Sequence, residues 1–85
     1  MEKYRLTIKP SAEKELSKAP KKILRQIVAK VRDLAIEPRP VGSEKLSGDE
    51  KYRVRQGDYR IVYSIDDKTR SVEVVRIGHR RDVYR

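Results

Sequence analysis

The segment KYRVRQGDYRIVY, residues 51–63, constrains the fold most, because it predicts two alternating strands joined by a Gly-Asp turn. Successive side chains of a strand point to opposite faces of a sheet, so Tyr52 and Val54 are expected on one face. Arg53 and Arg55 are then expected together on the other face. The segment therefore predicts an antiparallel hairpin that carries arginines inside its strands.

The chain before this hairpin predicts one strand and two helices. Residues 3–9 alternate apolar and polar side chains, which is typical of a strand with one buried face. Ser11 is expected to cap a short helix that ends near Lys18, and Pro20 is expected to begin a second helix. The apolar stripe of this second helix consists of Leu24, Ile27, Val28, Val31, Leu34 and Ala35.

After a loop rich in turn formers, three strands are expected at 51–56, 58–66 and 70–78. The order β-α-α-β-β-β predicts an α+β fold, with two N-terminal helices packed on one face of a mainly antiparallel four-stranded sheet. The first strand is expected to lie beside a later one, and the second face of the sheet is expected to stay open. The 85 residues are expected to form a single domain, 1–85.

The composition points to a polyanionic partner. Lys and Arg number 22 against 13 acidic residues, a net charge of +9, which favours nucleic acid or an acidic protein. The chain has no cysteine and one histidine, so neither a metal site nor a cofactor is expected. It has no long apolar run and no signal-peptide pattern, so we expect a cytoplasmic protein without a membrane segment.

Three arginines are expected to cluster in the hairpin. Arg60 has the strand parity of Val62 and Ser64. Its strand pairs in the hairpin with the strand that carries Arg53 and Arg55. Like charges on neighbouring strands repel, so we favour an anion site, since guanidinium groups suit phosphate geometry. The alternatives are solvated strand positions, or an internal acidic partner such as Glu73.

The C-terminal segment supplies further candidates. Arg80 and Arg81 follow a glycine at the end of the last strand. Tyr84 is interpreted either as an apolar anchor for the tail or as a proton-transfer or base-stacking group. We favour a surface or hydrogen-bonded role for His79 over a catalytic one.

Three segments, taken in order, resemble a known family. KLSG at 45–48, YRVRQGDYRIVY at 52–63 and VVRIGHRRDVYR at 74–85 resemble RelE-type toxins of the RelE/ParE toxin–antitoxin superfamily. The resemblance implies a small fold similar to microbial ribonucleases and a metal-independent endoribonuclease. It also implies cleavage of messenger RNA in the ribosomal A site, inhibition of translation, and a cognate acidic antitoxin that forms a complex with the toxin.

Matched motif by motif, the resemblance assigns action on the scissile phosphate to Arg53, Arg55, Arg60, Arg80 and Tyr84. Arginine cannot exchange protons at neutral pH, and lysines are common in relatives at the first two of these positions. Proton transfer is therefore left open between Tyr84 and His79. Relatives often continue into a C-terminal helix that the antitoxin displaces, and inhibition of that kind is not expected for a chain that stops at residue 85.

Other basic residues are candidates for contact with messenger or ribosomal RNA, with a solvated helix face as the alternative for those in the second helix. They are Lys21, Lys22, Arg25, Lys30, Lys45 and Arg81. Three rival functions remain: a ParE-like inhibitor of DNA gyrase, a plain RNA-binding module, and a family member that only binds its antitoxin. Tyr59 and Tyr63 have the parity of the apolar residues, so we expect them inside, which disfavours an RNA-stacking sheet.

Overall fold

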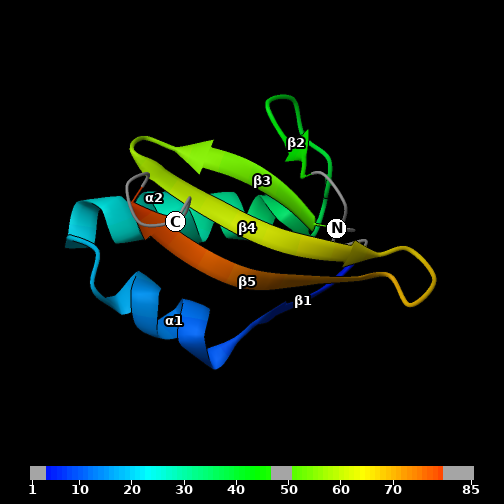
Figure 1. Ribbon diagram of the computed structural model, residues 1–85, viewed down its shortest axis with the longest axis horizontal. Helices are drawn as coiled ribbons and strands as arrows, with labels where there is room; N and C mark the ends of the chain where they lie inside the picture. Colours follow the sequence, from blue (N-terminus) through cyan, green and yellow to red (C-terminus); the bar gives the residue numbers. More distant parts are fainter. Residues whose placement is uncertain (1–3, 47–50, 80–85) are drawn as a thin grey trace.

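The computed structural model describes residues 4–46 and 51–79, which form a five-stranded sheet and two helices (Figure 1). The strand order across the sheet is β1-β5-β4-β3-β2; β1 is parallel to β5 and the other neighbours are antiparallel. The elements are β1 (Arg5–Ile8), α1 (Pro10–Ser17), α2 (Lys21–Leu34), β2 (Glu44–Lys45), β3 (Lys51–Gln56), β4 (Tyr59–Asp66) and β5 (Ser71–His79).

The predicted α+β order is confirmed, with one additional strand. The expected four strands are β1, β3, β4 and β5, and the first strand does lie beside a later one. The fifth strand, β2, has only two residues. A strand this short shows no alternation of apolar and polar residues, so its sequence resembles the surrounding loop.

Neither helix begins at the predicted residue: α1 begins two residues earlier and α2 one residue later. Pro10 is the first residue of α1 and Lys9 is the N-cap, so the prediction that Ser11 caps this helix is wrong. Proline suits the first helical position because its φ is fixed and it has no N–H to leave unbonded. Pro20 is the N-cap of α2, with an extended ψ of 148°, and the helix begins at Lys21.

The β3–β4 hairpin has the predicted two-residue turn. Gln56 pairs with Tyr59, which leaves only Gly57 and Asp58 between the strands. Gly57 has a φ of 61°, a left-handed conformation that tight hairpin turns require and that glycine adopts without strain. This turn fixes the register of every cross-strand pair in the hairpin.

The hydrophobic core lies between the sheet and the two helices. In Figure 1, α2 lies behind the sheet and α1 lies beside the C-terminal half of β5. The residues that β3 and β4 contribute to the core cluster come from one parity and include Val54, Ile61 and Tyr63. The expectation that Tyr59 and Tyr63 pack inside is met: Tyr63 is fully buried, and Tyr59 is half-buried against the core. Burial raises the pKa of the Tyr63 phenol to about 12.

A side chain from α1 completes the edge of β5 that β1 leaves uncovered. Strand β1 ends at Ile8, opposite Val74, and the chain then turns into α1. Further along β5, the Ile77 N–H donates to Glu15 Oε1 at 3.1 Å, and Glu15 Oε2 lies 3.6 Å from Arg76 Nε. A carboxylate thus accepts the backbone hydrogen bond that a longer β1 would have accepted.

The Glu15 contact gives a first prediction. Replacing Glu15 by Ala leaves the partly buried Ile77 N–H without its acceptor, so the free energy of unfolding is expected to fall by about 1–2 kcal/mol. Glu15→Gln keeps an acceptor oxygen and is expected to lose less. Urea unfolding measures both variants.

Glu13→Ala is the matched control, because Glu13 is an exposed acid in the first turn of the same helix. Loss of its interaction with the helix dipole is expected to cost about 0.5 kcal/mol. Equal losses for the two alanine variants would show that the Ile77 hydrogen bond does not stabilise the sheet edge.

Candidate nucleic-acid interface

The hairpin register brings Arg53, Arg55 and Arg60 together. Arg55 lies directly opposite Arg60, and Arg53 lies opposite Val62. Residues that face each other across an antiparallel pair share one face of the sheet, so the three arginines lie on the face away from the core residues. We call this set the arginine face.

The arginine face is less exposed than the sequence suggests. Arg53 and Arg60 are only 9% and 8% exposed, whereas Arg55 is exposed. The expectation that this face stays open is therefore wrong at Arg53 and Arg60, and the alternative of solvated strand positions does not fit them either. On β5, the residue directly opposite Arg60 is Gly78, which has no side chain.

Arg53 has an acidic partner in β2. Glu44 lies directly opposite Arg53 in the β2–β3 register, and its Oε2 forms a short ion pair with Arg53 Nη2. The sequence suggested Glu73 as an internal partner, but Glu73 lies opposite Ser64, further along the sheet. An internal acid is thus present at the arginine face, and it comes from the strand that the sequence does not reveal.

A β-bulge in β5 shifts the pairing beside the arginine face. Val62 pairs with Arg76 while Tyr63 pairs with Val74, which leaves Val75 as the extra residue of β5. Bulges re-aim the side chains that flank them. Here the bulge sets Arg76 opposite Val62, and a fourth guanidinium therefore lies on a strand next to Arg60.

His79 does not share the parity of the arginines. It lies opposite Tyr59, and the two rings meet edge to face with centroids 5.7 Å apart. It lines a cavity of about 260 Å³ together with Tyr59, Ile77 and Gly78 of the sheet, Glu15 of α1 and Lys18, the C-cap of that helix. The structure thus groups His79 with Tyr59 and α1, and its catalytic role remains a hypothesis.

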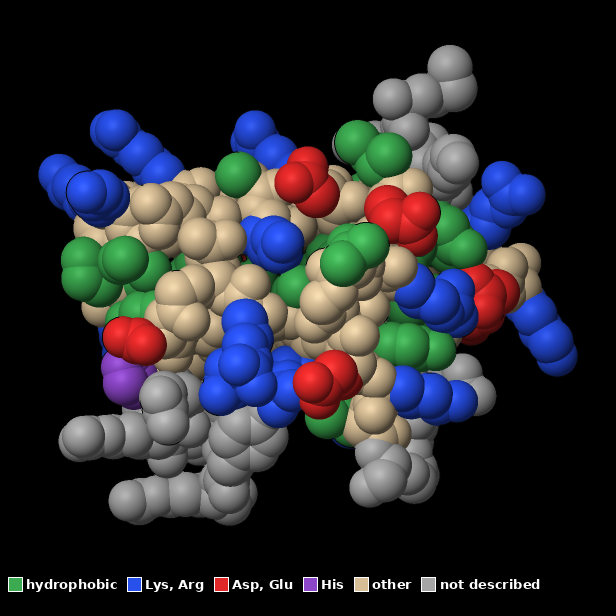
Figure 2. Space-filling view, turned by 90° about the horizontal axis from the view of Figure 1, so that it is seen from above, with side chains coloured by type: hydrophobic (Ala, Val, Ile, Leu, Met, Phe, Trp, Pro, Cys, Tyr) green, Lys and Arg blue, Asp and Glu red, His purple; other side chains and the backbone are tan. Residues whose placement is uncertain are grey.

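The remaining basic candidates lie in other parts of the molecule. Lys21, Lys22 and Arg25 are exposed on α2, behind the sheet, and Lys30 is half-buried there. Lys45 lies opposite Tyr52, on the other parity from Glu44. Figure 2 shows Lys and Arg side chains along the length of the molecule, with acidic side chains between them. The predictions for Arg80, Arg81 and Tyr84 fall outside the described residues.

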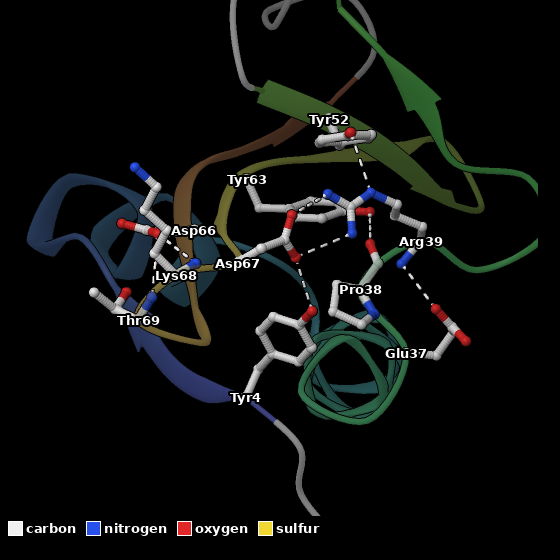
Figure 3. A network of polar contacts seen from close by, with 10 residues as sticks. All are labelled: Tyr4, Glu37, Pro38, Arg39, Tyr52, Tyr63, Asp66, Asp67, Lys68 and Thr69. Atoms are coloured by element: carbon white, nitrogen blue, oxygen red, sulfur yellow. Dashed lines mark hydrogen bonds and ion pairs between the residues drawn. The ribbon is translucent and has the colours of Figure 1, made fainter.

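A polar network at one end of the sheet was not foreseen from the sequence (Figure 3). Arg39 donates to Asp67 Oδ2 at 2.9 Å and to the Tyr52 hydroxyl at 3.2 Å, and its guanidinium carbon lies 5.2 Å from the centre of the Tyr52 ring. Tyr4 donates to Asp67 Oδ1 at 2.8 Å. Beside this network, the Tyr63 hydroxyl donates to the Pro38 carbonyl at 2.6 Å.

This network holds the segment that leads into β2. Arg39 and Pro38 lie between α2 and β2, whereas their partners come from β3, β4 and the β4–β5 turn. The Arg39 hydrogen bond, and then that from Tyr4, lowers the pKa of the Asp67 carboxyl below its ordinary value. The same carboxylate raises the pKa of the Tyr4 phenol. The position of Glu44 opposite Arg53 therefore depends partly on contacts made five residues earlier in the chain.

Among residues 4–46 and 51–79, no three histidine or acidic side chains lie close enough together to hold a metal ion. No helix in that part of the chain is long and apolar enough to span a membrane.

Comparison with known proteins identifies the family. A sequence model described as the ParE toxin of the type II toxin–antitoxin system parDE matches residues 6–84. Toxin RelG of Mycobacterium tuberculosis is 36% identical over 86 residues, which cover 96% of this chain and 97% of RelG. Toxin RelE of the same organism is 34% identical, over 96% of this chain and 87% of that toxin.

Solved structures agree with the sequence matches. The archaeal RelE–RelB complex from Pyrococcus horikoshii superposes with a TM-score of 0.84 at 30% identity, over 95% of this chain and 99% of the matched chain. The isolated RelE toxin of E. coli gives a TM-score of 0.78 at 28% identity, over 89% and 83% of the two chains.

Fold and sequence together define a small type II toxin, and the chain belongs to the RelE/ParE superfamily. Its relatives within that superfamily are RelE-type toxins, so the resemblance found in the sequence is confirmed.

The Asp67 contacts predict a pH dependence of stability. The folded pKa of Asp67 lies below its ordinary value of 3.8, so its contribution is present above that value and is lost as the pH falls through the folded pKa. Asp67→Asn is expected to unfold at a lower urea concentration than the wild type near neutral pH. The difference is expected to shrink as the pH falls below the ordinary value of 3.8 and the wild-type carboxyl becomes protonated.

Asp33→Asn, an exposed position on α2, controls for the change of net charge. A difference between Asp67→Asn and the wild type that stays constant from neutral to acidic pH would mean that ionisation of Asp67 does not stabilise the fold.

Proposed function

We propose that this protein is the toxin of a type II toxin–antitoxin pair and acts as a ribosome-dependent endoribonuclease, cutting messenger RNA in the A site. The observation that carries the proposal is the arginine face, where the β3–β4 register sets Arg55 against Arg60 and leaves Arg53 on the same side. Guanidinium groups donate paired hydrogen bonds that match phosphate oxygens, and membership of the RelE/ParE superfamily supports the same reading.

The proposed reaction needs three things from the site. The 2′-hydroxyl loses a proton and attacks the adjacent phosphorus, the pentavalent phosphorane is stabilised, and the bond to the 5′-oxygen breaks as that oxygen takes up a proton. The products are a 2′,3′-cyclic phosphate and a free 5′-hydroxyl. Arg53, Arg55, Arg60 and Arg80 supply positive charge to the phosphorane, but arginine transfers no proton at neutral pH.

Proton transfer is assigned to Tyr84, with His79 as the competing group. A phenol has a pKa near ~10, so its use as a base at neutral pH requires about 4 kcal/mol of preference for the phenolate. A guanidinium group held beside the phenol would supply part of this preference. Imidazole is the side chain that most often serves as a general acid or base in enzymes, which makes His79 the competing candidate.

Dependence on the ribosome follows from this incomplete set of acids and bases. Weak proton-transfer groups are effective when the substrate is held in a near-attack conformation, and a ribosome that presents the A-site codon provides such positioning. The exposed cations of α2, Lys21, Lys22 and Arg25, lie on another layer of the molecule and are available for contact with ribosomal RNA.

The proposed protein partner is an acidic antitoxin. Solved relatives include RelE–RelB complexes from an archaeon and from E. coli. A net charge of +9 suits an acidic, partly disordered chain that folds as it wraps a basic surface.

Inhibition of DNA gyrase is the second candidate, because the matching family model carries the description of a ParE toxin. Such a protein would act by binding and would not depend on charge at the arginine face for RNA cleavage. Transcript mapping and a DNA-damage reporter in the same cells distinguish the two functions.

Loss of Arg60 is expected to reduce cleavage by about 10²–10³-fold, the usual effect of removing one group that stabilises transition-state charge. The measurement is pulsed expression without antitoxin, followed by mapping of transcript 5′ ends with and without active translation. Arg80→Ala is expected to behave in the same way.

Lys68→Ala is the matched control, since Lys68 is an exposed cation in the β4–β5 turn, away from the arginine face. Its cleavage pattern is expected to equal that of the wild type. Growth arrest with intact transcripts and damaged DNA would replace the nuclease proposal by the gyrase one. Arrest with neither effect would leave a binding protein without nuclease activity.

The proton-transfer assignment has its own test. Tyr84→Phe is expected to slow cleavage by about 10²-fold or more while His79→Ala retains most activity, because general acid–base groups contribute on this scale. Rates are measured on programmed ribosomes under single-turnover conditions. Abolition of cleavage in His79→Ala with an active Tyr84→Phe would transfer the role to the histidine.

A further inference from the structure

The two side chains of the Glu44–Arg53 ion pair differ strongly in solvent exposure, and this difference bears on ligand binding. The Arg53 side chain is 10% exposed, whereas that of Glu44 is 63% exposed. The guanidinium is thus fixed among its neighbours, while the carboxylate has water on most sides. If the ion pair opens, rotation of the Glu44 side chain into solvent costs less free energy than movement of Arg53, because the carboxylate becomes hydrated and is not left buried without a partner.

The strand that carries Glu44 is held by few contacts. Among the described residues, two pairs join β2 to β3, Glu44 with Arg53 and Lys45 with Tyr52. One further backbone hydrogen bond, from Leu46 N to Lys51 O at 2.8 Å, follows them. Such a short edge strand resists side-chain rearrangement weakly, so the Glu44 carboxylate is free to give way to a stronger anion.

The neighbouring arginines explain why a carboxylate is useful at this position. Arg55 and Arg60 lie directly opposite each other, and Arg53 lies two residues from Arg55 on the same face. Like charges at such positions are destabilising. A carboxylate paired with Arg53 lowers the local positive charge in the free protein, and its own negative charge repels an incoming phosphate.

We propose that Glu44 is an internal counter-anion of the arginine face, which the phosphate backbone of RNA displaces from Arg53 when it binds. This inference rests on the proposed function, because it takes RNA as the ligand of this face. Glu44 then lowers the affinity for RNA, because a phosphate must compete with the carboxylate for Arg53. Ligands that present several phosphates at once are favoured, because their other phosphates bind the remaining arginines.

The test measures binding separately from cleavage. The full-length chain is titrated into a fluorescent 2′-O-methyl oligoribonucleotide, which has no free 2′-hydroxyl to react, and anisotropy gives the Kd. Glu44→Gln removes the charge and is expected to tighten binding about fivefold, as one unit charge a few ångströms from the phosphate would do at a protein surface. Thermal unfolding of each variant verifies that it is folded.

Two comparisons identify the cause of any gain. Glu13→Gln changes the net charge equally from α1 and is expected to alter Kd by less than about twofold, because salt screens distant exposed charges. In an Arg53→Ala background, Glu44→Gln is expected to give a clearly smaller gain, because only the direct repulsion between the carboxylate and the phosphate remains to be removed. Weaker binding by Glu44→Gln, a gain equal to that of Glu13→Gln, or a gain that is undiminished without Arg53 would each overturn the inference.

Failure of the proposed function has a different signature. If Arg55→Ala and Arg60→Ala leave the Kd for RNA unchanged, RNA does not bind the arginine face. The inference about Glu44 would then be wrong as well. A parallel titration with polyglutamate tests an acidic protein as ligand. A gain for polyglutamate without one for RNA would overturn the inference by assigning the displaced contact to an acidic chain.

Discussion

The alternation of side chains in the β3–β4 hairpin controls the rest of this structure. One parity supplies core residues such as Val54, Ile61 and Tyr63, and the other parity therefore carries the arginines. Burial of each large apolar side chain stabilises the fold by about 1.5–3 kcal/mol, whereas like-charged cross-strand pairs cost up to about 1 kcal/mol. The core thus dominates, and a one-residue slip that would separate the charges would also expose the apolar set.

The parts of the fold that are encoded locally could be predicted from the sequence. Alternation located β3, β4 and β5, the Gly57 turn set their register, and the arginine cluster followed from that register. The start of α2 differs by one residue because proline is compatible with both the N-cap and the first helical position, and the start of α1 differs by two because Pro10, not Ser11, sets it. These are errors between neighbouring positions in a correct element.

The parts that depend on distant residues could not be predicted. Arg39 and Asp67 are 28 residues apart, and the Glu44–Arg53 pair exists only because a two-residue strand docks on β3. Neither contact leaves a periodic pattern in the sequence. The near-burial of Arg53 and Arg60 was missed for a similar reason, since strand parity gives the face of a side chain and not how much of that face is covered.

The arginine face and the candidate proton-transfer groups need different things from the fold. Guanidinium groups act through fixed charge, so a rigid hairpin with a set register is sufficient to position them. Proton transfer needs a group whose pKa and distance suit a moving proton, and His79, the candidate within the described residues, shares the parity of Tyr59 instead. On the proposed function, the hairpin therefore stabilises charge regardless of which residue moves the proton. Charge stabilisation alone accelerates a correctly held substrate, which is consistent with a nuclease that relies on the ribosome for geometry.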